Sequence, residues 1–374
     1  MTAISRLDTS IVGRWWWTID RWTLIAVGLL IAIGAVLSLA ASPAVAERLG
    51  YDQFFFSRRQ LLYLMPAVAM IFAVSLLSPL AVRRVAAVGF VGALALLVAT
   101  TLVGDPVNGA RRWLFIGGFS LQPSEFVKPT LIVVTAWMLA EHRKHEGAPG
   151  LWIATVLIAL VVGLLVLQPD IGMALVVGAV GFGQLFLAGM PMGWVLALVA
   201  LALVGFVAAY ATLPHVASRV DRFLDPASGD SYQIDTAIEA FRSGGLFGRG
   251  PGEGSVKTVL PDAHTDFIFA VAAEEFGLAL CLLLVGLFAF IVLRGIGRLM
   301  REGDLFVMLA AGGLLIEFGI QALINMGVTL RLLPTKGMTL PFISYGGSSL
   351  LAVGLGMGML LALTRRRAGG EGVT

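Results

Sequence analysis

Residues 260–277, LPDAHTDFIFAVAAEEFG, carry a titratable side chain to the edge of a long apolar run, where Asp266 lies. A carboxylate drawn to the centre of a bilayer costs about 2.5 to 3.5 kcal/mol, so an acid at the edge of a membrane helix is a candidate for function. The same segment could instead cap the helix that follows, with Thr265 or Asp266 accepting hydrogen bonds from its first amides. A catalytic carboxylate and a helix cap are both open at this position.

The composition of the chain places these residues in an integral membrane protein. Apolar residues make up 58% of the chain and charged residues 13%, against about 25% charged in an ordinary soluble domain, and the mean hydropathy is +0.91. Long apolar runs recur, and each is near the roughly 20 residues that a helix needs to cross the hydrocarbon. We predict an all-α polytopic protein with about ten transmembrane helices, at residues 22–42, 61–80, 85–103, 126–140, 151–167, 171–188, 194–213, 267–293, 305–326 and 343–363.

The distribution of Lys and Arg predicts the orientation of these helices. Short loops that would be cytoplasmic, if the N-terminus is, hold more Lys and Arg than the short loops opposite. We therefore predict one membrane domain over residues 1–374, with cytoplasmic segments at 1–21 and 365–374. A large outer loop, residues 214–265, separates the seventh and eighth helices. The first apolar run lacks a convincing cleavage site, so we expect no cleavable signal peptide.

Cysteine and histidine limit the chemistry. The only cysteine, Cys281, lies within an apolar run, so no intramolecular disulfide can form. His142 and His145 share a loop with Arg143 and Lys144, which indicates a solvated basic cluster rather than a zinc site. Neither a P-loop nor a Rossmann glycine fingerprint is present, so the energy for a reaction either arrives with the substrate or is not needed.

The predicted topology brings four polar motifs to the same outer face. In the first, residues 108–128, Arg112 stands beside Trp113. A guanidinium grips phosphate bidentately and an indole anchors at the interface, so the two suit an anionic lipid headgroup. Glu125 and Lys128 follow near the outer end of a helix, three residues apart. They are either functional or a structural ion pair.

The second and third motifs have simpler explanations beside a functional one. In residues 164–172, Gln168, Pro169 and Asp170 interrupt apolar sequence, which a turn between helices explains, with Asp170 capping the next helix. The outer loop contains many glycines, and its residues 233–242 are typical of an amphipathic helix lying on the membrane. The same loop carries two further cations, Arg219 and Arg222.

The fourth motif, residues 327–351, lies at the mouth of the last helix. It contains Lys336, and we expect Pro341 to begin the helix. Ser344 and Ser348 flank a glycine pair that interrupts regular packing. Such backbone is tolerated at membrane depth only when it lines a cavity or is buried in protein.

These motifs together resemble the SEDS family of bacterial wall-synthesis proteins, the family of FtsW, RodA and SpoVE. The resemblance rests on NGARRWL, QPSEF, LQPDIG, RFLDP, LPDAHTDFIFAVAAEEFG and LPTKGMTLPFISYGGSSL, which occur in the right order across nearly the whole chain. The last of them is closer to the division-associated branch than to the elongation branch. Two departures are visible: Asp262 stands where the family usually has Glu, and the sequence before Tyr232 is less typical.

The resemblance implies a peptidoglycan glycosyltransferase in the bacterial cytoplasmic (inner) membrane, at the division septum. It would polymerise lipid II into a nascent glycan strand at the outer face, with Asp266 as the essential catalytic residue. The implied partners are a class B penicillin-binding transpeptidase, other divisome membrane proteins and membrane lipid, with no nucleic acid.

Such a reaction needs a carboxylate to take a hydroxyl proton and cations to balance a departing lipid diphosphate. Asp266 suits the first role. No cofactor is required by the sequence and no metal cluster is evident, although a divalent cation, Mg²⁺ or Mn²⁺, could share the second role. The expected substrate-binding residues are Arg112, Trp113, Glu125, Lys128, Arg219, Arg222, His264, Thr265, Lys336, Ser344 and Ser348.

Two other classes of function stay open. In a lipid II flippase or transporter, the polar residues would line a path instead of performing a reaction, and ten helices with broken ends would suit that role equally well. A transport route needs polar positions through the membrane depth, whereas the inner halves of these helices are nearly all apolar, with Glu317 and Gln321 the main exceptions. A scaffold that recruits a partner enzyme is the third class.

Overall fold

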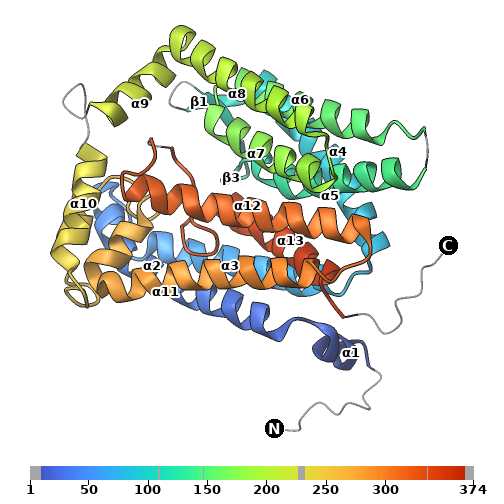
Figure 1. Ribbon diagram of the computed structural model, residues 1–374. Helices are drawn as coiled ribbons and strands as arrows, with labels where there is room; N and C mark the ends of the chain where they lie inside the picture. The colour runs from blue at the N-terminus through green and yellow to red at the C-terminus, as the bar shows by residue number, and fades with distance from the viewer. Residues whose placement is uncertain (1–9, 108–109, 146, 226–231, 335, 367–374) are drawn as a thin grey trace.

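The predicted all-α membrane architecture is confirmed. The computed structural model describes residues 10–107, 110–145, 147–225, 232–334 and 336–366 (Figure 1). Each of the ten apolar runs coincides with one helix, and these are α2 (Arg21–Arg48), α3 (Phe55–Ser75), α4 (Pro79–Val103), α5 (Pro123–Lys144), α6 (Gly150–Leu167), α7 (Ile171–Leu187), α8 (Met192–Thr212), α11 (Ile268–Leu299), α12 (Leu305–Thr329) and α13 (Gly347–Leu363).

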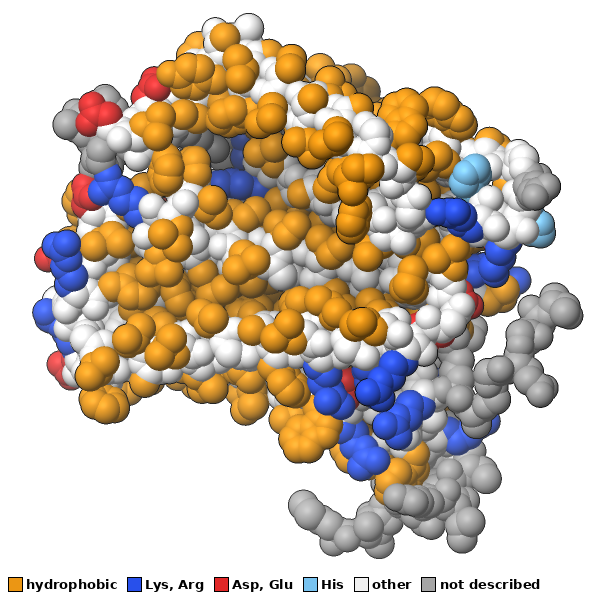
Figure 2. All heavy atoms as spheres, in the orientation of Figure 1, with side chains coloured by type: hydrophobic (Ala, Val, Ile, Leu, Met, Phe, Trp, Pro, Cys, Tyr) orange, Lys and Arg blue, Asp and Glu red, His pale blue; other side chains and the backbone are white. Residues whose placement is uncertain are grey.

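Six of these helices are long and apolar enough to cross a membrane by length and composition alone: α2, α4, α6, α8, α11 and α12. The helices α7 and α13 are apolar but shorter, and α3 and α5 contain charged residues. Large hydrophobic side chains cover the outside of the bundle, as the front face in Figure 2 shows. An apolar exterior of this extent is what a helix bundle presents to lipid. The chain is a multi-pass membrane protein.

A small sheet interrupts the helical pattern and was not predicted. The strands β1 (Asp105–Val107), β2 (Ala110–Ile116) and β3 (Phe119–Leu121) form an antiparallel ribbon in the order β1-β2-β3. Gly117 and Gly118, with φ of 57° and 81°, make the tight turn between β2 and β3. The ribbon fills the connection between α4 and α5.

The two ends of the bundle differ in what they carry. At one end, the short helix α1 (Ile11–Thr18) meets the end of α13, where Arg366 N donates to Thr18 O over 2.9 Å. At this terminal end, Arg294 binds Asp20 through two hydrogen bonds of 2.8 Å, and Figure 2 shows Lys and Arg side chains gathered there. The opposite end, here called the loop end, carries the sheet, α9 (Pro214–Leu224), α10 (Tyr232–Gly244) and residues 245–267, 330–334 and 336–346.

The amphipathic helix predicted at residues 233–242 exists as α10, but its apolar face does not lie on the membrane. Ile234 and Ala237 are buried, and the helix packs on α11, with the Phe241 and Phe269 rings 5.6 Å apart. The pattern predicted the helix correctly but the surface it packs on wrongly. A helix that packs on protein and a helix that lies on lipid need the same apolar stripe, so the sequence pattern does not distinguish them.

The start of α11 anchors the loop that follows α10. The Glu274 carboxylate accepts from the backbone N–H of Val256 and of Lys257, at 2.7 and 2.9 Å, and Lys257 pairs with Glu275. Gly277 has a φ of 75° and breaks the helical dihedrals of α11. Because it has no side chain, the backbone of Leu246 and Gly248 can lie close against it. The EEFG sequence therefore fixes the segment that leads to Asp266.

The helix α12 lies at the centre of the bundle. Of its most apolar stretch, 67% is buried inside the protein, whereas the corresponding figure for α8 is 6%. The residues between α12 and α13 differ from prediction, because α13 begins at Gly347 and not at Pro341. Residues 341–344 form a turn in which Phe342 has a φ of 64°.

We predict that this turn depends on a glycine of α2. A Cβ atom added at Gly34 would overlap the Phe342 carbonyl oxygen, whereas one added at Gly28 would meet nothing within 4 Å. Gly34→Ala should lower the midpoint of thermal unfolding of the purified protein, because overpacking of this kind costs about 1 to 3 kcal/mol. Gly28→Ala is the matched control and should leave the midpoint unchanged or raised. Equal midpoints for both variants would contradict the assigned contact.

Candidate functional site

Asp266 lies in the turn directly before α11 and does not cap that helix. The residue at the cap position is Phe267, which makes no side-chain cap hydrogen bond, and neither Thr265 nor Asp266 takes that position. Instead, the Phe267 N–H donates to the Asp262 carbonyl at 3.2 Å, and the Ala270 N–H donates to the Phe267 carbonyl at 2.9 Å. The helix-cap explanation is therefore wrong, and the carboxylate is left for another role.

Three neighbours define the environment of the Asp266 carboxylate. A Cβ atom at Gly337 would lie 2.7 Å from its Oδ2, so the absence of a side chain there lets the two segments meet. Burial, together with the charge of Asp262 and against the opposing charge of Lys336, raises the pKa of Asp266 to about 7. A base whose pKa lies near the working pH is effective in proton transfer. The carboxylate is therefore suited to act as a general base.

Asn325 of α12 holds the backbone of Asp266 and is not among the residues predicted from the sequence. Its Nδ2 donates to the Asp266 carbonyl at 2.9 Å and to the Met338 carbonyl at 2.6 Å. A signal was available in the sequence, since Glu317, Gln321 and Asn325 follow one another at four-residue spacing and so share a helix face.

His264 and Thr265 are held by the segment before α13. The Tyr345 N–H donates to the His264 carbonyl at 2.9 Å, and the Ser344 hydroxyl donates to the Thr265 carbonyl at 2.6 Å. The His264 ring packs on Phe56, with centroids 4.4 Å apart. Burial, together with the charge of Arg48, lowers the pKa of His264 to about 4. The imidazole is therefore neutral near pH 7 and does not act as a cation beside Asp266.

Two cations, Lys336 and Arg112, lie close enough at the site to influence one another. The side chain of Lys336 runs against Gly172, and its Nζ is buried without a hydrogen-bond partner among the described residues. Burial lowers the pKa of Lys336 to about 7. Arg112 donates to the Pro169 carbonyl at 2.6 Å and lies 3.7 Å from Asp170. Figure 2 shows Lys and Arg side chains within a hollow beneath α8 and α9, where an anion would meet them.

Asp170 also confirms the turn predicted between the sixth and seventh helices. It is the N-cap residue of α7, and its Oδ1 accepts from the Met173 N–H at 3.1 Å. The same carboxylate faces Arg112, so this turn both starts a helix and holds a cation at the site.

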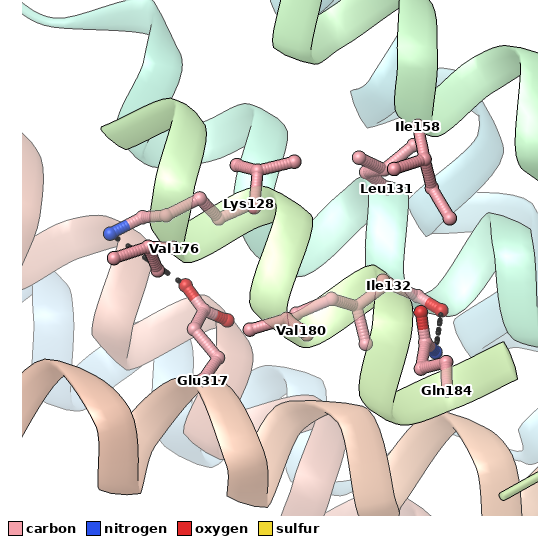
Figure 3. A pocket seen from close by; sticks show the side chains of 10 residues that line it. Lys128, Leu131, Ile132, Ile158, Val176, Val180, Gln184 and Glu317 are labelled. Atoms are coloured by element: carbon pink, nitrogen blue, oxygen red, sulfur yellow. Dashed lines mark hydrogen bonds and ion pairs between the residues drawn. The ribbon is translucent and has the colours of Figure 1, made fainter. Parts of the chain in front are cut away.

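Lys128 lies deeper in the bundle, at the centre of a buried polar group. Its Nζ is 3.0 Å from Glu125, 3.8 Å from Glu317 and 3.1 Å from the Oε1 of Gln321. Figure 3 shows the Lys128 side chain extending toward Glu317 at one end of a pocket lined mainly by apolar residues, with Gln184 at the other end. The predicted pair of Glu125 and Lys128 is formed, and only 6% and 3% of these residues is exposed.

The remaining predicted residues have different positions. Ser348 ties α13 to the sheet, because its hydroxyl accepts from the Gln122 N–H at 3.0 Å and donates to the Ser120 carbonyl at 3.2 Å. Trp113 lies on β2, paired with Asp105 of β1. Arg219 and Arg222 belong to α9 at the loop end, but their side chains lie outside the described residues.

The polar residues from four segments thus meet at the loop end. Around Asp266 the described part of the chain supplies one further carboxylate, Asp262, and one ammonium, Lys336. No group of three His, Cys, Asp or Glu side chains suited to a metal occurs among the described residues. The arrangement can accept a proton at Asp266 and can bind an anion at Lys336 and Arg112.

The sequence is similar to known proteins over nearly its whole length. A family model for FtsW, RodA and SpoVE, described as "Cell cycle protein", matches residues 21–369. A protein of Caulobacter vibrioides named "Probable peptidoglycan glycosyltransferase FtsW" is 49% identical over 374 residues, which cover 100% of this chain and 96% of the relative. A protein of Coxiella burnetii with the same name is 38% identical over 363 residues, covering 93% and 96% of the two chains.

Two solved structures are similar in fold. One chain, from work described as "Structural coordination of polymerization and crosslinking by a peptidoglycan synthase complex", has a TM-score of 0.74 and 30% identity, covering 92% of this chain and 97% of that one. The rod shape determining protein RodA of Thermus thermophilus has a TM-score of 0.69 and 30% identity, covering 93% and 97%.

Proposed function

The chain belongs to the family of the FtsW, RodA and SpoVE cell cycle proteins, and from this membership we propose that it is a peptidoglycan glycosyltransferase that polymerises lipid II into glycan strands. The observation that carries the proposal is the Asp266 carboxylate, which caps no helix and lies under the influence of Lys336, at the end of the bundle where the polar motifs meet. The name shared by the relatives with high identity favours the division role over the elongation role.

In the proposed reaction, Asp266 takes the proton of a sugar hydroxyl on the acceptor lipid II. The hydroxyl oxygen forms a bond to the anomeric carbon at the reducing end of the growing strand. The bond between that carbon and the lipid diphosphate breaks, and the diphosphate leaves with the electron pair. Asp266 then releases the proton to solvent. The activated donor supplies the driving force, which fits the lack of a nucleotide motif in the sequence.

Lys336 and Arg112 are proposed to balance the charge of the departing diphosphate. Lys336 has a buried ammonium group without a partner among the described residues, so an arriving anion would meet an uncompensated donor. Arg112 presents a guanidinium, which can bind phosphate oxygens in a bidentate manner. Lys128 is less available, because two carboxylates and an amide already surround it.

A divalent cation could also help to balance the charge of the diphosphate. Mg²⁺ commonly binds through one or two carboxylates together with substrate phosphates. The described surroundings of Asp266 contain one further carboxylate and a lysine, which is not a donor set for a dedicated metal site. A cation would have to arrive with the diphosphate, and no step of the proposed reaction depends on it.

The proposed setting is the cytoplasmic membrane at the division septum, with the loop end outside. The gathering of Lys and Arg at the terminal end supports this orientation. A class B penicillin-binding transpeptidase is the proposed partner, supported by the similarity to a chain from a complex that coordinates polymerisation and crosslinking. Such a partner should co-purify with the chain from membranes.

We predict that the orientation can be read from two cysteine variants made in a Cys281→Ala background. Glu253→Cys, at an exposed position of the loop end, should react in intact cells with a thiol reagent that cannot cross the membrane. Glu302→Cys, exposed between α11 and α12, should react only after the membrane is opened. The reverse pattern would place the site on the cytoplasmic side and overturn the proposed reaction with external substrate.

The central prediction concerns Asp266 and its neighbour Asp262. General base catalysis typically supplies about 10² to 10⁴ in rate, so Asp266→Asn should lower lipid II polymerisation by the purified protein by that factor. Asp262→Asn is the matched control, since asparagine tolerates the φ of 51° found there and the residue is exposed. It should retain polymerisation.

Polymerisation by Asp266→Asn at the rate of the parent would refute the catalytic assignment. The flippase alternative predicts a different pattern, in which the purified parent moves lipid II across a vesicle membrane without joining its sugars.

A pH prediction follows from the two groups whose pKa lies near 7. The reaction needs Asp266 ionised and Lys336 protonated, so kcat/KM should rise and then fall around pH 7, with the two groups titrating as a coupled pair. Lys336→Arg should move the alkaline limb upward, because a guanidinium stays charged. Asp262→Asn should move the acid limb downward, because it removes a like charge from Asp266. Unchanged limbs in both variants would show that other groups control the reaction.

A further inference from the structure

Four polar side chains follow one another along one face of α12. They are Glu317, Gln321, Asn325 and Thr329, spaced four residues apart and at most 8% exposed. Residues four apart lie one above the other on a helix. We call these four residues the α12 polar stripe. It runs from the middle of the bundle to the loop end.

Members of the stripe hold different segments of the chain. Glu317 lies 3.8 Å from Lys128 of α5. Gln321 accepts from Lys128 and donates to the Thr339 carbonyl at 3.1 Å. Thr329 differs, because its hydroxyl bonds only within its own helix, to the Asn325 carbonyl at 2.8 Å. Of the four, Asn325 is the one whose side chain hydrogen-bonds, among the described residues, to the segment that bears Asp266.

The orientation of the Asn325 amide is determined by its two partners. Both partners are carbonyl oxygens, so only the NH₂ group can donate to them. The Oδ1 atom is buried and has no hydrogen-bond partner among the described residues. A buried unpaired acceptor costs about 1 to 3 kcal/mol of folding free energy. The two hydrogen bonds that the NH₂ group donates offset this cost at Oδ1.

These two bonds join the two sides of the site. One fixes the backbone of Asp266, and the other fixes Met338, which directly follows Gly337 and Lys336. Gly337 lies against the Asp266 carboxylate, and Lys336 is the cation whose charge acts to lower the pKa of Asp266. A single amide therefore sets the position of the acid relative to both neighbours.

The bond to Asp266 completes a set of three. Three consecutive carbonyls, those of His264, Thr265 and Asp266, accept hydrogen bonds from Tyr345, Ser344 and Asn325. The first two donors belong to the segment before α13, and only Asn325 belongs to a regular helix of the bundle core. Asn325 therefore links the backbone of Asp266 to the rigid helix bundle, and so fixes the position of the carboxylate relative to the bundle.

We propose that Asn325 is a positioning residue, which holds the Asp266 carboxylate at the working distance from Lys336 and from the acceptor hydroxyl. The inference rests on the proposed function of Asp266 and extends it to a residue that touches no substrate. Its expected signature is kinetic, since a displaced base slows the chemical step while substrate binding by other groups persists.

The test compares Asn325→Leu with Thr329→Val, with lipid II as substrate for the purified protein. Both changes remove a buried polar group from the same face of α12, but only the first frees Asp266. For Asn325→Leu, kcat should fall about 10²-fold, as expected for a misplaced catalytic group, with KM changed less than about 3-fold. Thr329→Val should keep both constants within about 3-fold of the parent, because its lost bond is local.

A second variant covers the case in which Asn325→Leu does not fold. In Gly337→Ala, the new methyl would displace the Asp266 carboxylate while Asn325 stays intact, and the same loss in kcat at constant KM is expected. Loss of activity in proportion to loss of thermal stability, or a rise in KM in place of the fall in kcat, would overturn the positioning role. If the parent itself does not polymerise lipid II, the proposed function fails first, which separates the two failures.

Discussion

A charged side chain at the edge of a membrane is stable only when protein groups replace the water it has lost. At the loop end this requirement governs the whole site. The partly exposed Arg112 faces the buried Asp170, and the buried Lys128 faces Glu125 and Glu317. Asp266 stands outside that balance, with a like charge at Asp262 and one opposing cation. Burial and this incomplete compensation together raise its pKa, and a pKa near the working pH is the property that a general base needs.

Incomplete compensation is useful only if the geometry is fixed. The segments that meet at Asp266 have little regular structure, and each would lose conformational freedom on ordering. They are held by buried hydrogen bonds to a helix that is itself mostly enclosed by protein. In a low dielectric, such bonds are costly to break, because a freed carbonyl would find no water. The polar face of α12 therefore explains how irregular backbone can be stable at this depth.

Much of this arrangement could be predicted from the sequence, because its signals are local. The length and apolarity of the runs predicted ten helices, and the junction of polar and apolar residues predicted that Asp266 lies at the edge of a membrane helix, while its catalytic role stays a prediction. The strands around Arg112 were missed because strands of three to seven residues depend on pairing across a turn, not on propensity. The start of α13 was misplaced because Pro341 can begin a helix or a turn. Asn325 was missed because its partners lie 59 and 13 residues away, and only the fold brings them together.

The proposed catalytic role of Asp266 depends most on the pH at which its carboxyl group ionises in the folded protein. Infrared difference spectroscopy of the purified protein in lipid can follow the carbonyl band of a protonated carboxyl group, and subtracting the spectrum of Asp266→Asn isolates this residue. The account predicts a band that appears as the pH falls through about 7, where burial and Asp262 place the pKa. A band that appears only near pH 4, the ordinary range of an aspartate, would contradict it.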